Sequence, residues 1–117
     1  RAMEEEFIFI NLIDTDQLYG HRLDPSGYAE ALKEIDSALP KIMDELTGED
    51  LLIITGDHGN DPCVQSTDHT REFVPVFVYG KQVAAKNLGL RNGFNQIAAS
   101  VMDFFGYEKT FGPESLL

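Results

Sequence analysis

The sequence has a single cysteine and no long apolar run, and each of these absences excludes a class of protein. Cys63 alone cannot form an internal disulfide, so we expect a reducing compartment and a cytoplasmic location. No window approaches the ~20 consecutive apolar residues of a transmembrane helix. Residues 1–7 also lack the basic-then-apolar order of a signal peptide. The sequence therefore predicts no membrane insertion and no secretion.

Basic residues are scarce as well, with 9 Lys and Arg against 20 Asp and Glu, and the net charge is -11. Such a surface repels nucleic-acid backbones and anionic lipids, so we expect neither as a partner. The acidic side chains either form a solvated surface or gather where a cation neutralises them. Composition leaves both interpretations open, and only the positions of the carboxylates can separate them.

Three short apolar runs predict β-strands, at residues 7–13 (FIFINLI), 51–55 (LLIIT) and 73–79 (FVPVFVY). The first run is continuous and rich in β-formers, which predicts a strand buried on both faces, as in a parallel sheet. Pro75 lies inside the third run and predicts an edge strand or the entry into a strand.

Two segments show helical periodicity. Asp24 and Pro25 predict the first turn of a helix, because aspartate caps a helix N-terminus well and proline suits its first position. Apolar residues then recur every three or four positions up to residue 46, and we expect Pro40 to kink or split this helix. A second amphipathic helix is predicted for residues 94–105, ending at Gly106. The segment from Tyr107 to Leu117 is interpreted as a tail that wraps over the surface.

The order of elements is strand, helix, strand, strand, helix, which predicts an α/β fold with a mostly parallel sheet flanked by helices. A strand–helix–strand start favours a right-handed crossover and a parallel pair. Residues 1–117 suffice for a single domain. A sheet of about three strands is nevertheless thin, because typical sheets contain ~5–6. The chain therefore reads as part of a larger fold.

Chemistry-bearing residues concentrate in the polar loop at residues 14–24 and in the segment that follows the second strand. Both loops start at strand ends, where ligand sites of open α/β sheets lie. Imidazoles and carboxylates together are the ligand set for Zn²⁺, Mn²⁺ or Fe²⁺. The candidates are the three histidines His21, His58 and His69, with the aspartates Asp14, Asp16, Asp57, Asp61 and Asp68.

Several of these residues have a plainer alternative. A loop aspartate is often a turn residue or a cap, and this interpretation stays open for Asp14, Asp61 and Asp68. Cys63 is either a partly buried loop residue or a soft metal ligand. Arg71 either pairs with a neighbouring acid or clamps a phosphate.

Three motifs resemble the phosphopentomutases, which belong to the alkaline phosphatase superfamily. They are DTDQLYGHR at 14–22, GDHGNDP at 56–62 and TDHTREFVPVFVYG at 67–80. The resemblance continues in order from about residue 7 to residue 106. It implies that residues 1–117 are the C-terminal portion of an alkaline-phosphatase-like, metal-binding core domain.

The resemblance also implies two divalent metal ions, typically Mn²⁺, although a His/Asp site accepts Zn²⁺ too. One ion would be held by Asp16, His21 and His69, and the other by Asp57 and His58. The Asp-x4-His spacing of the family favours Asp16 over Asp14 as the ligand.

Parts that the family needs have no counterpart in the motifs of this chain. These are a threonine nucleophile, an aspartate near the enzyme N-terminus and the inserted cap domain that binds the pentose. No catalytic residue and no organic cofactor site is therefore assigned. The implied partner protein is the remainder of the same enzyme, and the isolated chain is expected to be catalytically incomplete.

The implied activity is an isomerase reaction of nucleoside and pentose phosphate metabolism, with ribose or deoxyribose phosphate as the small-molecule substrate. One alternative is another enzyme of the superfamily, such as a cofactor-independent phosphoglycerate mutase, a phosphodiesterase or a sulfatase, and the missing nucleophile would separate these. A second alternative is a non-catalytic metal-binding module, which would fold as a stable monomer with a self-sufficient site.

Overall fold

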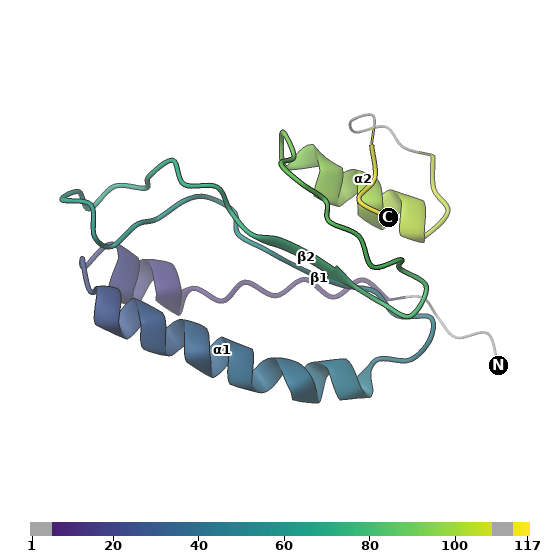
Figure 1. Cartoon of the computed structure of the whole chain (residues 1–117), viewed down its shortest axis with the longest axis horizontal. Coiled ribbons are helices and arrows are strands. Elements are labelled where there is room, and N and C mark those ends of the chain that lie inside the picture. The colour runs from purple at the N-terminus through teal and green to yellow at the C-terminus, as the bar shows by residue number, and fades with distance from the viewer. Residues whose placement is uncertain (1–5, 109–113) are drawn as a thin grey trace.

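The computed structural model describes residues 6–108 and 114–117. Figure 1 shows a two-stranded sheet that lies between one long helix, α1, and a shorter helix, α2. The mixture of helices and strands confirms the α/β class. In chain order the elements are the π-helix η1 (Thr15–Gly20), α1 (Pro25–Glu45), β1 (Leu52–Thr55), β2 (Val76–Tyr79) and α2 (Asn95–Phe104).

The two strands pair antiparallel, with Leu52 opposite Tyr79 and Thr55 opposite Val76. Both strands were predicted, and β2 begins directly after Pro75, which is therefore a strand entry. The prediction of a mostly parallel sheet is wrong for the described residues. The chain returns from β1 to β2 through a loop without a crossover helix, and such a connection joins antiparallel neighbours.

The strand predicted for residues 7–13 does not form. The segment is neither helix nor strand, and its large apolar side chains are between 47% (Ile13) and 80% (Phe9) exposed. A strand requires a neighbour to take up its backbone hydrogen bonds, and no described segment pairs with it in a sheet. The expected crossover between this run and β1 is accordingly absent from the described part of the chain.

Helix α1 begins as the sequence predicts. The Asp24 carboxylate accepts a hydrogen bond of 2.9 Å from the backbone N–H of Gly27, and Pro25 occupies the first turn. Pro40 was expected to kink or to split this helix, and the split does not occur, because the helix continues without a break to Glu45. A proline removes one backbone hydrogen bond, and the bonds on either side hold the helix together.

The polar loop predicted for residues 14–24 is partly helical. Its first half is the π-helix η1, in which the N–H of His21 donates to the carbonyl of Asp16 at 3.0 Å. The N–H of Asp24 bonds the carbonyl of Tyr19 over the same five-residue interval, at 3.0 Å. π-Helical turns are rare, and those that occur are frequently at functional sites. This one carries the predicted metal ligand Asp16, and the predicted ligand His21 follows directly as its C-cap.

Helix α2 ends at Phe104, and Gly106, the predicted stop, follows its C-cap with a φ of 72°. The N–H groups of Gly106 and Tyr107 donate to the carbonyls of Asp103 (3.1 Å) and Met102 (2.8 Å), which is the Schellman arrangement. A residue at positive φ is required here, and glycine adopts that conformation without steric cost.

The described end of the chain packs against α2. Leu116 is only 2% exposed, and its N–H donates to the hydroxyl of Ser100 at 2.8 Å. The predicted surface tail also includes residues 109–113, which lie outside the described part of the chain. Residues 1–5, on which the signal-peptide argument drew, lie outside it as well.

The described chain is elongated and buries little apolar surface. Its radius of gyration is 16.1 Å, whereas a compact domain of this length has about 13 Å. Its accessible surface is 9068 Å², against about 6,400 Å² for a compact monomer of this mass. Ala99 and Leu116 are the buried hydrophobic residues of the described part. No described helix has both the length and the apolar character needed to cross a bilayer.

The cap of α1 yields a stability prediction. Asp24→Ala removes the acceptor for the N–H of Gly27 and should lower the free energy of unfolding by about 1 kcal/mol. Urea unfolding of the purified protein, followed by circular dichroism, measures the change.

Asp36→Ala is the matched control, because it removes the same charge from an exposed position inside the same helix. Alanine is the better helix former there, so stability should stay equal or rise. A loss as large as that of Asp24→Ala would show that charge, not capping, is responsible.

Candidate metal centre

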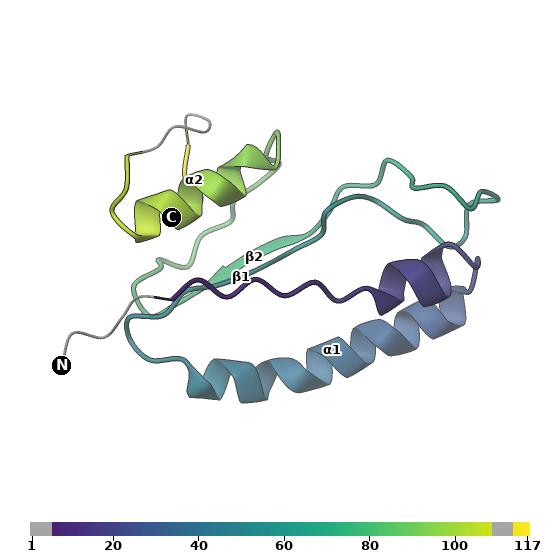
Figure 2. The same ribbon diagram turned by 180° about the vertical axis from the view of Figure 1, so that it is seen from behind.

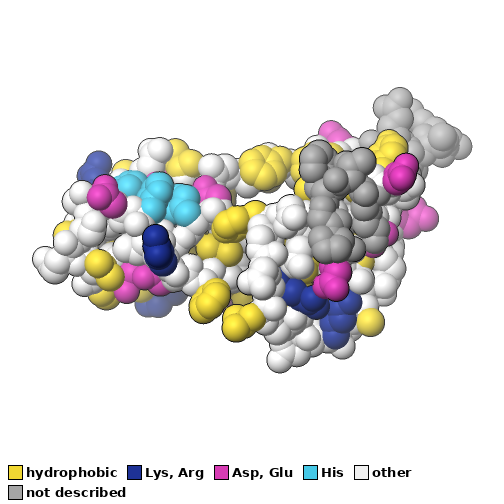
Figure 3. Space-filling view, turned by 90° about the horizontal axis from the view of Figure 1, so that it is seen from above, with side chains coloured by type: hydrophobic (Ala, Val, Ile, Leu, Met, Phe, Trp, Pro, Cys, Tyr) yellow, Lys and Arg dark blue, Asp and Glu magenta, His cyan; other side chains and the backbone are white. Residues whose placement is uncertain are grey.

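The candidate metal centre lies at the end of the sheet where β1 ends and β2 begins. Asp16 comes from η1, His58 from the loop after β1, and His69 from the segment before β2. Figure 3 shows the histidine side chains gathered in one patch with carboxylates beside them. Residues far apart in the sequence thus meet at one place.

Asp16 is the centre of this group. Its Oδ1 lies 3.4 Å from Nε2 of His69, and its Oδ2 lies 3.3 Å from Nε2 of His21. Ligand atoms of Asp16, His58 and His69 all fall within 4.8 Å of one another. The rings of His58 and His69 stack with their centroids 3.6 Å apart and an interplanar angle of 19°.

These distances suit a divalent cation. Ligand atoms that each lie about 2.1 Å from one ion are separated by about 3.0–3.4 Å for bond angles between 90° and 109°. The two contacts of Asp16 with histidine nitrogens have this length. Imidazole nitrogen and carboxylate oxygen are also the donors that Zn²⁺ and Mn²⁺ accept. The residues present therefore fit a metal ion.

The backbone sets the tautomers of two histidines. Nδ1 of His21 contacts the carbonyl oxygen of Thr67, and Nδ1 of His58 lies 3.3 Å from the carbonyl of Gly59. A carbonyl only accepts hydrogen bonds, so in the neutral rings each Nδ1 carries the proton. Nε2 of both rings then keeps its lone pair, as a metal ligand must.

A backbone bridge holds the loop after β1 against the segment that leads to β2. The N–H of Thr70 donates to the carbonyl of Gly59 at 3.0 Å. A Cβ at Gly59 would lie 2.7 Å from both the carbonyl of Thr70 and the N–H of Glu72, so only glycine permits this approach. The Thr70 hydroxyl accepts from the N–H of Asp61 at 2.8 Å and donates to Glu72.

The structure places the remaining predicted residues less centrally. The Asp57 side chain is 74% exposed, and its Oδ1 lies 3.6 Å from Nε2 of His58. It is not part of the tight group of Asp16, His58 and His69. Asp61 accepts a hydrogen bond from the N–H of Cys63 at 2.8 Å, which is the turn role left open for it.

Two residues near the centre were not singled out from the sequence. Asn60 donates a hydrogen bond to Asp16, and its place within the GDHGNDP motif was the available signal. Tyr28 is one of the apolar residues that recur along the helix predicted from Pro25. Burial, followed by the charges of Asp16, Asp61 and Glu72, raises the pKa of its phenol, so Tyr28 senses the carboxylates of the site.

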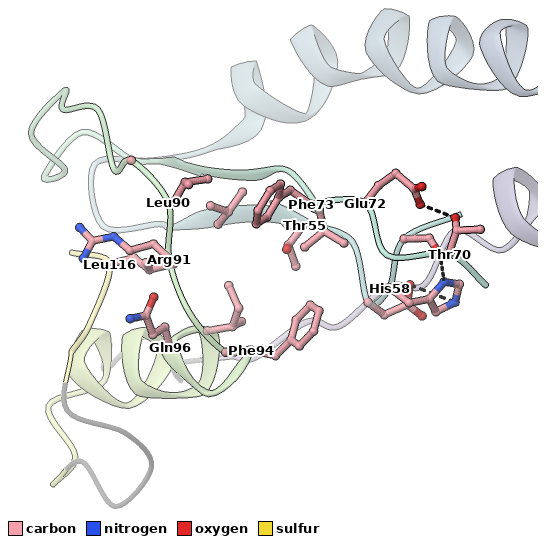
Figure 4. A pocket seen from close by; sticks show the side chains of 17 residues that line it. Thr55, His58, Thr70, Glu72, Phe73, Leu90, Arg91, Phe94, Gln96 and Leu116 are labelled. Atoms are coloured by element: carbon pink, nitrogen blue, oxygen red, sulfur yellow. Dashed lines mark hydrogen bonds and ion pairs between the residues drawn. The ribbon is translucent and has the colours of Figure 1, made fainter. Parts of the chain in front are cut away.

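A cavity of about 420 Å³ adjoins the centre. Figure 4 shows His58, Thr70 and Glu72 at one end of it and Phe94, Gln96 and Arg91 on the α2 side. The cavity leaves His58 accessible from the direction of α2.

The sequence profile of the Metalloenzyme superfamily matches residues 1–109. The chain belongs to this superfamily. The assignment agrees with the histidine and carboxylate group at the end of the sheet, because that group has the composition and spacing of a metal site.

Within the metalloenzyme superfamily, the chain is similar to curated proteins named phosphopentomutase. It is 50% identical to that of Alkaliphilus metalliredigens over 92% of its length, and 53% identical to that of Carboxydothermus hydrogenoformans over 90%. The protein of Desulfitobacterium hafniense (strain DSM 10664 / DCB-2) is 47% identical over the whole chain. The chain spans only 27–30% of the length of these relatives.

The thiol of Cys63 provides a pH-dependent prediction. Desolvation and the nearby Asp61 carboxylate raise the pKa of Cys63, which keeps the less reactive protonated form present at higher pH. Asp61→Asn removes the negative charge, so the pKa should fall and alkylation by iodoacetamide at pH 8 should become faster. The rate of alkylation between pH 7 and 10 measures the shift.

Asp68→Asn is the control, since it also removes one carboxylate from the same loop region but does not affect the Cys63 thiol. Its alkylation profile should match the wild type. Identical profiles for all three proteins would contradict the assigned role of Asp61.

Proposed function

We infer that this chain is the C-terminal portion of the metal-binding core of a phosphopentomutase. The parent enzyme would interconvert (deoxy)ribose 1-phosphate and 5-phosphate, a reaction of cytoplasmic nucleoside and pentose phosphate metabolism. The proposal is carried by one combined observation, the agreement between sequence similarity and the position of the motif residues in space. Relatives of that name are 47–53% identical across 90–100% of the chain, and the motif residues converge on Asp16 in space.

Five side chains would serve as metal ligands in this enzyme. Asp16, His21 and His69 would hold one divalent ion, and the approach of the Asp16 carboxylate to Nε2 of each of these two histidines supports that set. Asp57 and His58, adjacent in sequence and 3.6 Å apart at their polar atoms, would contribute to the second. Further ligands of the second ion would come from the remainder of the enzyme. We expect Mn²⁺, with Zn²⁺ as the alternative that the same donors accept.

Phosphoryl transfer concentrates negative charge on the phosphate oxygens. When bound, two divalent ions would neutralise that charge and so stabilise the transferring phosphoryl group. The contribution of this chain is to position the ligands. The carbonyls of Thr67 and Gly59 orient the rings of His21 and His58, and the bridge between Gly59 and Thr70 keeps the two loop segments in register.

The proposal predicts unequal effects of two substitutions in the same loop. In the protein that contains this chain, His58→Ala should lower kcat/KM for ribose 5-phosphate isomerisation by at least about 100-fold, as expected when a metal ligand is lost. Cys63→Ala should leave the rate near that of the wild type, because Cys63 is exposed and outside the ligand group. A coupled assay of ribose 1-phosphate formation measures both.

Equal losses in the two variants would mean that the cysteine is a functional ligand. Equal retention of activity would exclude His58 from the metal site. Metal content by mass spectrometry accompanies each assay, and His58→Ala should retain less metal than Cys63→Ala.

A second prediction concerns the 117 residues alone. We expect this polypeptide, purified by itself, to show no turnover of ribose 5-phosphate, because the chain contains no residue that matches the threonine nucleophile of the resembled family. The test is the same assay at high protein concentration with added Mn²⁺. Measurable turnover that follows the protein through purification would overturn the proposal that a nucleophile must be supplied from elsewhere.

A further inference from the structure

Among the described residues, the carboxylate of Asp16 also has a partner outside the predicted set of metal ligands. The side-chain amide of Asn60 donates a hydrogen bond of 2.6 Å from Nδ2 to Oδ1 of Asp16. This short contact joins η1 to the loop after β1 across 44 positions of the sequence, and it is partly buried. Asn60 therefore contacts Asp16, the residue that lies near the candidate histidine ligands.

The same amide is packed against Gly20. Gly20 is the buried residue of η1, and a Cβ at this position would lie only 2.3 Å from Nδ2 and 2.7 Å from Cγ of Asn60. Its backbone does not have a positive φ, so conformational freedom does not explain the glycine. The absent side chain instead makes room for the amide of Asn60.

An amide suits this position chemically. A carboxylate offers about four lone-pair sites, so Oδ1 of Asp16 can accept from Asn60 and still direct a lone pair elsewhere. The amide is neutral and brings no charge that competes with a cation, whereas a carboxylate at position 60 would repel Asp16. The hydrogen bond also restricts rotation of the Asp16 side chain, whose Oδ2 faces His21 and whose Oδ1 faces His69.

We propose that Asn60 is a positioning residue of the metal centre, and that it holds the Asp16 carboxylate in a metal-binding orientation. The missing side chain of Gly20 leaves the space that the Asn60 amide occupies. The proposal rests on the proposed function, because it presupposes a divalent ion at Asp16. Residues that orient metal ligands by hydrogen bonds typically change metal affinity by 10–100-fold when they are substituted.

The test is Mn²⁺ binding by isothermal titration calorimetry, with no assay of activity, in the purified protein that contains this chain. Asn60→Ala should raise the Kd for Mn²⁺ by about 10–100-fold. Gly20→Ala should also weaken binding, since its new methyl group displaces the amide. In the double variant the methyl group no longer meets the amide atoms, so its Kd should equal that of Asn60→Ala alone.

Gly48→Ala is the matched glycine control. The nearest atom to a Cβ at position 48 is Cδ of Lys81 at 3.8 Å, so this variant should bind Mn²⁺ as the wild type does. Melting temperatures of the metal-free proteins establish that each variant is folded. Gly20→Ala retains Asn60 itself and therefore tests the inference even where Asn60→Ala fails to fold.

The outcomes separate the two proposals. If His69→Ala weakens Mn²⁺ binding but Asn60→Ala and Gly20→Ala do not, the metal centre stands and the positioning role is overturned. If the losses of Mn²⁺ affinity in the two single variants add in the double variant, Asn60 and Gly20 act independently, and the proposal that Gly20 makes room for the Asn60 amide is wrong. A wild-type protein that binds neither Mn²⁺ nor Zn²⁺ would overturn the metal centre and the positioning role together.

Discussion

The meeting of separate chain segments at the Asp16 carboxylate is the interaction on which the organisation of this structure depends. One oxygen faces Asn60 and His69, and the other faces His21. These contacts tie η1 to the loop after β1 and to the segment before β2, in a molecule whose apolar core is very small. Polar contacts at a single carboxylate therefore hold together loops that hydrophobic packing does not.

Electrostatics favours a cation at this junction. A chain with a net charge of -11 gains from any site that gathers positive charge, and here the histidines and carboxylates already face one another at ligand distances. Burial is the first cause of the raised pKa of Tyr28, and the charges of Asp16, Asp61 and Glu72 add to it, because they disfavour a phenolate. A divalent ion would relieve this repulsion, which links metal binding to the stability of the loops.

Much apolar surface remains uncovered away from the centre. The segment 7–13 exposes phenylalanine and isoleucine side chains, and α1 has no buried residue although one of its faces is apolar. Figure 2 shows the same open arrangement from behind, with α1 and α2 well separated. Since the relatives are more than three times as long as this chain, such surfaces are where a larger fold would pack. The described part of the chain therefore has an organised polar site but only a small buried apolar core.

The sequence by itself determined the features that depend on neighbours along the chain. These include the cap at Asp24, the edge or entry position of Pro75, the helix end near Gly106 and the set of residue types that can bind a metal. It failed for residues 7–13, because a strand exists only when another strand takes up its hydrogen bonds. Only the tertiary structure decided that Asn60 contacts Asp16 and that the Asn60 amide packs against Gly20. Those contacts join residues about forty positions apart, and no local periodicity or propensity encodes which distant loops will meet.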